Sequence, residues 1–169
     1  MLLDAWAQVR PDGWRLQITG PDEAGETERL RKAIAAHDLG DTVELTGPCY
    51  GSDKDELLRR ASLFVLPTFS ENFGIVVAEA LGFETPVITT TGAPWRALQT
   101  DDCGWWVAPE TGAITQALRA ATAADAEELA RLGRNGRKLV ERDFSWDKAA
   151  RAIKQFYHDL LRDAGRTAP

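Results

Sequence analysis

Two glutamates, eight positions apart, are the residues of this chain best placed to do chemistry. Glu71 and Glu79 lie in the segment 61–95, which carries three carboxylates and no Lys or Arg to pair with them. A carboxylate accepts two hydrogen bonds, which suits the vicinal hydroxyls of a ribose or hexose. The spacing places one carboxylate in a loop and the other one to two turns into a helix, so both could face one ligand. Each also has a structural alternative: an acid that complements the helix dipole, and the solvated residue of an amphipathic helix.

Between the two glutamates, the sequence predicts the start of a helix that suits a phosphate. A buried strand ends at Pro67, which cannot donate to a strand ladder, and a loop then leads to Gly74. The N–H groups at a helix start, here about 72–75, and the positive end of its dipole attract anions, while a glycine allows close approach to the backbone. In a doubly wound sheet such a loop lies at the carboxyl edge of the strands, where ligands bind.

The elements that must position these residues alternate between strands and helices. Short apolar runs predict strands, and helical periodicity between them predicts helices, which is typical of βαβ units on a parallel sheet. The predicted strands are 14–19, 43–46, 63–66, 86–89 and 105–107, and the helices between them are 26–37, 54–61 and 74–81. Three helices without a strand follow, at 114–123, 126–142 and 145–162. The predicted fold class is therefore α/β: a Rossmann-like parallel sheet with helices on both faces and an all-helical C-terminal end.

The first nine residues look like the second half of a helix. Leu2, Leu3, Trp6 and Val9 recur at helical spacing, whereas a parallel α/β domain normally opens with a strand. We therefore expect the first strand of the sheet to be missing, because it precedes Met1. A native amphipathic N-terminal helix is the alternative. At the other end, we expect 164–169 to be a frayed tail.

The composition excludes several classes of protein. The 169 residues, 44% apolar and 27% charged, fit one globular domain rather than a disordered or membrane-embedded chain. A net charge of −6 argues against nucleic acid as a partner. Cys49 and Cys103 belong to no metal-ligand motif, so we expect neither a zinc site nor a disulfide scaffold. No apolar run reaches the length of a membrane span, and a reducing, cytoplasmic location is the simplest prediction.

The ordered motifs of the chain resemble those of glycosyltransferase family 4, also called group 1, whose members are retaining enzymes of the GT-B fold. The segment F-V-L-P-T-x-S-E-N-F-G-I-x-x-A-E-A-L, followed by T-P-V-I-T-T, is similar to the E-x7-E donor-site segment of that family. LQITG, VELTG-P and GRNGRKLVERDFSW are similar to its other strand and helix signatures. PW-x-x-L with DDCGWWV resembles members that build bacterial lipopolysaccharide or other surface glycans.

The resemblance implies that 1–169 is a single nucleotide-sugar-binding domain, the C-terminal half of GT-B, truncated at its N-terminus and without its acceptor domain. The full-length enzyme would transfer a sugar from an NDP-sugar to a glycan or lipid-linked acceptor, in bacterial surface polysaccharide or lipopolysaccharide synthesis. The isolated chain would bind donor weakly and transfer nothing. No metal or other cofactor is implied, because the helix dipole and basic side chains replace it. Family members often associate peripherally with the inner membrane, which the sequence leaves open here.

The resemblance also implies a role for each matching residue. Glu71 is the implied catalytic residue, close to the hydroxyls of the donor sugar, and Glu79 binds the ribose hydroxyls. The backbone N–H groups of Asn72, Phe73 and Gly74 are implied to bind the sugar, and those of Gly74 and Ile75 to bind the diphosphate. The implied base site lies near Gly47, Pro48, Cys49 and Tyr50. Gly20 is implied to border the same cleft.

The sequence departs from the family pattern in three places. The Arg and Lys that stabilise the leaving diphosphate would precede Met1, Glu84 stands where Gly is usual, and Arg96 where an acid is common. We interpret Glu84 and Arg96 as surface variation, with altered donor preference as the alternative. Two other functions remain open: a nucleotide-sugar 2-epimerase of similar fold, which would need more acids and a His in the cleft, and a non-catalytic nucleotide-binding domain.

The surroundings of two tryptophans can also be predicted. Trp95 is expected to lean toward the interdomain cleft. Trp146 is expected to pack the last helix onto the body of the domain.

Overall fold

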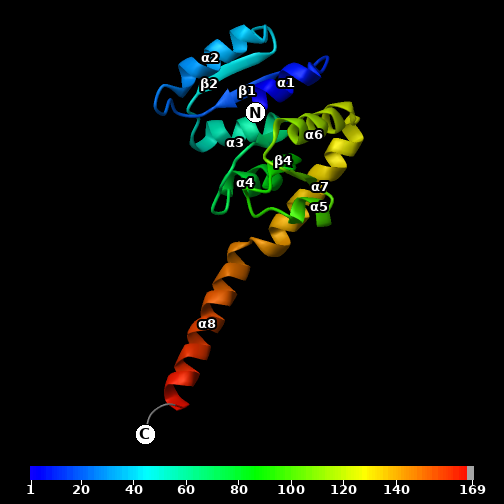
Figure 1. Cartoon of the computed structure of the whole chain (residues 1–169). Helices are drawn as coiled ribbons and strands as arrows, with labels where there is room; N and C mark the ends of the chain where they lie inside the picture. Colours follow the sequence, from blue (N-terminus) through cyan, green and yellow to red (C-terminus); the bar gives the residue numbers. More distant parts are fainter. Residues whose placement is uncertain (167–169) are drawn as a thin grey trace.

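The computed structural model describes residues 1–166 as an α/β domain from which one long helix protrudes (Figure 1). Strands and helices alternate as far as β5, and helices alone follow, which confirms the predicted fold class. In chain order the elements are α1 (Leu2–Val9), β1 (Leu16–Thr19), α2 (Glu26–Ala36), β2 (Val43–Gly47), α3 (Gly51–Arg60), β3 (Phe64–Leu66), α4 (Ile75–Gly82), β4 (Val87–Thr90), α5 (Ala97–Thr100), β5 (Gly104–Val107), α6 (Thr111–Ala123), α7 (Ala126–Asp143) and α8 (Trp146–Arg166).

The five strands are all parallel but form two separate sheets. β1 pairs with β2, while β4 lies between β3 and β5 in the second sheet. All four residues of β4 are buried, as expected for a strand covered on both faces. Within the described residues, β1 and β3 each pair with a strand on one side only. The other edge of β1 and the other edge of β3 therefore have no strand partner among these residues.

Two hydrophobic clusters cover the two faces of the second sheet. Val87 belongs to a cluster with Leu58, Val77, Leu81 and Leu98, mostly from the helices α3, α4 and α5. Its neighbour Ile88 belongs to the other cluster, together with residues of α1 and α6. Successive residues of a strand point to opposite faces, so the two clusters lie on opposite sides of the sheet.

Helices α4 and α7 approach each other closely because α7 carries glycines at the contact. A Cβ at Gly133 would lie 1.8 Å from the backbone oxygen of Glu84, and one at Gly136 would lie 2.5 Å from a methyl carbon of Leu81. Both glycines are buried. The close packing fixes the position of α4, the helix that carries Glu79.

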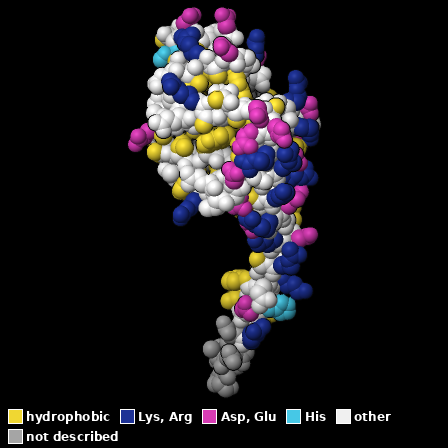
Figure 2. Space-filling model, turned by 90° about the vertical axis from the view of Figure 1, so that its right-hand side faces the viewer, with side chains coloured by type: hydrophobic (Ala, Val, Ile, Leu, Met, Phe, Trp, Pro, Cys, Tyr) yellow, Lys and Arg dark blue, Asp and Glu magenta, His cyan; other side chains and the backbone are white. Residues whose placement is uncertain are grey.

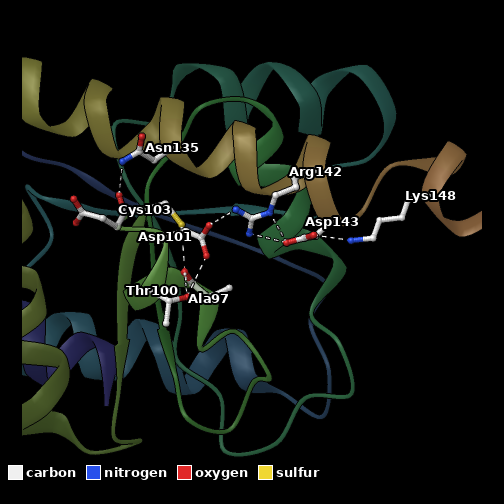
Figure 3. Close-up of polar contacts among 9 residues, drawn as sticks. Ala97, Thr100, Asp101, Cys103, Asn135, Arg142, Asp143 and Lys148 are labelled. Carbon is white, nitrogen blue, oxygen red and sulfur yellow. Dashed lines mark hydrogen bonds and ion pairs between the residues drawn. The ribbon is translucent and has the colours of Figure 1, made fainter.

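The end of α7 is tied to the segment between α5 and β5 by charged side chains (Figure 3). The Arg142 guanidinium lies 2.7 Å from the Asp101 carboxylate and 2.7 Å from that of Asp143, which also lies 2.6 Å from Lys148 Nζ. These two cations lower the pKa of Asp143 to about 2. Cys103 lies next to this group, and its burial raises the pKa of the thiol to about 12.

Helix α8 leaves the body and exposes its apolar side chains. Trp146 is 90% exposed, so the prediction that it packs the helix onto the body is wrong. Phe144, two residues earlier, makes that contact instead, because its ring packs against those of Phe73 and Trp95. Figure 2 shows Lys and Arg mixed with Asp and Glu along α7 and the upper part of α8, and hydrophobic side chains further down α8.

Helix α8 continues past position 164, where a frayed tail was predicted to begin. Residues 167–169, the rest of that predicted tail, lie outside the described part of the chain. None of the helices in residues 1–166 is both long and apolar enough to cross a membrane.

Candidate functional site

The start of α4 is built around a glycine, as the sequence predicts. Gly74 is the N-cap of the helix and has a φ of +72°, a left-handed conformation that favours glycine. A Cβ at this position would lie 3.2 Å from Cγ of Glu71 and 3.4 Å from Nε1 of Trp95. Both the backbone conformation and the tight surroundings therefore call for glycine, and the helix begins at Ile75.

Glu71 lies at this helix start. Its side chain packs beside Gly74, and its Oε1 accepts a hydrogen bond from the Asn72 N–H at 3.0 Å. Its own N–H donates to the carbonyl of Gly92 at 2.9 Å. Glu71, Asn72 and Gly74 are thus brought together. The Asn72 amide, which the resemblance assigns to the donor sugar, is bonded to Glu71 in this structure.

Residues that follow β4 support the loop that precedes α4. A Cβ at Gly92 would lie 2.6 Å from the carbonyl oxygen of Thr68, so the two backbones nearly touch. The Thr90 hydroxyl donates to the same carbonyl, and the Trp95 indole N–H donates to the carbonyl of Phe73. The sequence analysis missed these supports, although the glycine shortly after a strand is a signal of close backbone approach.

Trp95 does not face a cleft, so that expectation is wrong. It is 1% exposed and lies in the cluster beneath the loop. The reason is physical: the indole ring buries a large apolar area, and its N–H finds a partner in the loop carbonyl, so the whole side chain can leave solvent.

Glu79 is partly buried and paired with a cation. Lys54 Nζ, from α3, lies 2.6 Å from Oε1 of Glu79, and the two side chains are 34% and 31% exposed. The hydrogen bond to this carboxylate raises the pKa of Lys54. Sequence reasoning found no partner for Glu79 within segment 61–95, and the actual partner comes from a helix that precedes it. No local pattern marks Lys54 for this role.

The residues of the predicted base site divide between two cavities. Pro48 and Cys49 line a cavity of about 500 Å³ beside α3, and Tyr50, just before that helix, is 72% exposed. Gly47 lies beside Gly20, whose N–H donates to the Gly47 carbonyl at 3.1 Å. These two glycines line a smaller cavity of about 190 Å³ on the side of α2. Lys54 connects the region near Cys49 with α4, since it lies one turn into α3 and reaches Glu79.

The parallel sheets, the flanking helices and the glycine-capped helix start define a Rossmann-like domain with a helix terminus suited to an anion. The family model of the glycosyl transferases group 1 matches residues 1–139, and the chain belongs to this family. Its fold is that of the C-terminal domain of GT-B glycosyltransferases. Family and fold class are therefore confirmed.

Several known proteins are similar to the chain. It is 32% identical to a D-inositol 3-phosphate glycosyltransferase of Streptomyces bingchenggensis, over 96% of this chain and 38% of the relative. It is 31% identical to the putative colanic acid biosynthesis glycosyltransferase WcaL of Escherichia coli, over 85% of this chain and 37% of that protein. The fold matches that of Anabaena HepE, solved with UDP and glucose, with a TM-score of 0.80 and 20% identity, over 94% and 44% of the two chains. The chain therefore spans less than half the length of these proteins.

Proposed function

We propose that this chain is the donor-binding domain of a glycosyltransferase that passes a sugar from a nucleoside diphosphate sugar to a glycan or lipid-linked acceptor and retains the anomeric configuration. The observation that carries the proposal is the start of α4, where the Gly74 residue is buried beside Glu71 and the next residue, Ile75, is exposed. Within residues 1–166, the amides of Gly74 and Ile75 donate to no carbonyl or side chain, and Ile75 is 68% exposed. Free N–H groups at the positive end of a helix dipole bind phosphate.

The two glutamates supply contacts on either side of that diphosphate position. Glu71, at the loop, contacts the hydroxyls of the donor sugar and is the proposed catalytic residue. The Phe73 backbone amide contacts the same sugar, and so does the Asn72 amide once it exchanges its bond to the Glu71 carboxylate for one to the ligand. Glu79, one turn into the helix, binds the ribose. Its Oε1 is held by Lys54, which leaves Oε2 for a ribose hydroxyl and fixes the plane of the carboxylate.

The nucleoside base lies near the start of α3. The loop of Gly47, Pro48, Cys49 and Tyr50 precedes that helix, and Gly20 directly follows β1, the neighbouring strand. The relatives support the ligand and acceptor classes: HepE was solved with UDP and glucose, and WcaL is named for colanic acid biosynthesis. The acceptor binds to a part of the enzyme outside this chain.

A further parallel strand fills the gap between β1 and β3 in the whole enzyme. Ile18, in β1, and Pro67, directly after β3, line one cavity of about 360 Å³, together with Leu2 and Leu30. Amides of successive residues in a strand point to alternate sides, so the amides of Gln17 and Val65 face the gap. Hydrogen exchange at these two amides should be slow in a longer form of the protein and fast in the present chain. Equal exchange in both forms contradicts the strand.

Titration of the 169-residue chain with UDP, GDP and ADP, by calorimetry or NMR, tests the donor site. We expect one of the three to bind, and Glu79→Gln to weaken that binding by ~1.5–3 kcal/mol, the value of a hydrogen bond to a charged group. Glu84→Gln is the matched control, because it removes a carboxylate just beyond the C-terminal end of α4, whereas the proposed site is at the N-terminal end of that helix. If the folded chain binds none of the nucleotides at millimolar concentration, the proposal is wrong.

A further inference from the structure

The plane of one peptide decides whether the start of α4 can receive an anion. In a trans peptide the C=O and N–H bonds point in opposite directions, and all peptide bonds described here are trans. The Phe73 carbonyl and the Gly74 N–H belong to the same peptide unit. If that unit rotated by half a turn, the carbonyl oxygen rather than the N–H would face the phosphate.

Gly74 by itself does not hold this plane. Rotation of the peptide changes φ of the residue that follows, and glycine accepts φ of either sign at little cost. Gly74 has a φ of +72°. A half-turn of the peptide would bring φ of Gly74 to a negative value, which any residue adopts, so the backbone of this residue does not by itself favour the observed orientation and another group must select it.

The Trp95 indole makes that selection. Its N–H donates to the Phe73 carbonyl, and the ring is 1% exposed. The carbonyl is thereby directed toward the interior, which turns the Gly74 N–H away from the indole. The ring itself cannot shift easily, because the Phe73 ring lies 5.2 Å and the Phe144 ring 5.1 Å from it, centroid to centroid.

We infer that Trp95 is a positioning residue for the donor diphosphate: by binding the Phe73 carbonyl, its indole N–H holds the Gly74 amide toward the phosphates. This inference rests on the proposed function. Trp95 touches no substrate in it and acts only through the Phe73–Gly74 peptide. It predicts that loss of the indole N–H affects the part of the ligand that lies at the helix start and spares the nucleoside.

The experiment compares a nucleoside diphosphate with the corresponding monophosphate, using whichever of UDP, GDP and ADP the wild-type chain binds best. Trp95→Phe keeps an aromatic ring and removes the indole N–H. We expect its diphosphate affinity to fall about tenfold, which corresponds to loss of the hydrogen bond between the Gly74 amide and a charged phosphate. Monophosphate affinity should change less than about twofold, since the shift is confined to the helix start. Phe144→Leu is the matched control: it loosens the same aromatic cluster but removes no donor, so the diphosphate preference should persist.

Three results decide the matter. Loss of the diphosphate preference in Trp95→Phe, with retention in Phe144→Leu, supports the inference. An unchanged preference in Trp95→Phe overturns it and leaves the donor site intact. If the wild-type chain binds no nucleotide, the proposed function fails and the inference fails with it. Should Trp95→Phe not fold, site-specific benzothienylalanine at position 95, which replaces the indole N–H by sulfur at nearly the same shape, provides the same test.

Discussion

Glu84 has a left-handed backbone conformation, which glycine usually adopts. Its φ is +62°, and it lies two residues beyond the end of α4, where the chain turns toward β4. The side chain compensates only weakly, because Arg137 lies 3.8 Å from its carboxylate and both groups are about half exposed. The departure from the family's usual glycine therefore costs conformational energy at a place remote from the start of α4, which fits surface variation better than altered donor preference.

Glu84→Gly should stabilise the chain by about 1 kcal/mol, because relief of the left-handed strain exceeds the entropy that glycine adds to the unfolded state. Urea unfolding, followed by circular dichroism, measures the change. Glu84→Ala separates the causes: alanine keeps the strain and loses the ion pair, so it should give no gain. A Glu84→Gly chain less stable than wild type would show that the ion pair with Arg137 outweighs the strain.

Asp143 gives the junction of α7 and α8 a defined pH dependence. Arg142 and Lys148 lower its pKa from 3.8 to about 2 in the folded chain. A lowered folded-state pKa stabilises the fold above the unfolded value and loses that contribution as the pH falls through the folded value. The stability difference between wild type and Asp143→Asn should therefore be constant above pH 5 and vanish between about pH 4 and pH 2. A difference that persists at pH 2 contradicts this ion-pair network.

At the scale of elements, α7 packs closely against α4 and the turn that follows it, with Gly133 beside the backbone of Glu84 and Gly136 beside Leu81. The backbone of Glu84 lies where a Cβ of residue 133 would be, and backbone cannot move aside as a flexible side chain can. This contact also sets the position of α4, so damage to it should reach the proposed donor site.

Gly133→Ala should destabilise the chain by ~1–3 kcal/mol or more, since overpacking of a close helix contact forces the helices apart. Gly136→Ala should cost less, because its neighbour is the end of the Leu81 side chain. Gly112, in α6, has no atom within 4 Å of its would-be Cβ, so Gly112→Ala should be neutral or stabilising by up to ~1 kcal/mol. Thermal unfolding of the three variants gives the order. Equal loss in all three would mean that packing at Gly133 has no special weight.

The sequence predicts elements well where a periodic apolar pattern is long enough. Helix α7 was predicted at 126–142 and runs to Asp143, and Asp125 caps its start by accepting the Glu128 N–H at 2.8 Å. Helix α5 escaped prediction because four residues cannot show a helical period. The contacts of Lys54 with Glu79 and of Trp95 with the Phe73 carbonyl could not be predicted, for a different reason. Both contacts arise only in the tertiary fold, and the sequence around Lys54 or Trp95 carries no local signal for them.

At the scale of the whole molecule, α8 stands apart from the two clusters that hold the body together. Besides Trp146, it exposes Ile153, Phe156, Tyr157, Leu160 and Leu161, each at least half exposed. An isolated helix is marginally stable in water unless a packed face supports it. The stability of α8 in this chain therefore owes little to the packing that stabilises the body.

A chain that ends at Ser145 should unfold with nearly the same midpoint as the full chain when near-ultraviolet circular dichroism of the buried tryptophans is followed. The far-ultraviolet signal of the full chain should lose helix at a lower temperature than that transition, because α8 melts first. A single transition common to both signals, or a large drop in the midpoint after truncation, would show that α8 supports the body.

The position of Phe144 has a practical consequence for anyone who shortens this protein. The ring that packs against Phe73 and Trp95 belongs to Phe144, the C-cap residue of α7, two residues before α8 begins. A chain cut after Asp143, at the end of α7, would lose this ring and would uncover the Phe73 and Trp95 rings beside the start of α4. A shortened chain that keeps Phe144 preserves the aromatic contacts that hold the end of α7 against Phe73 and Trp95.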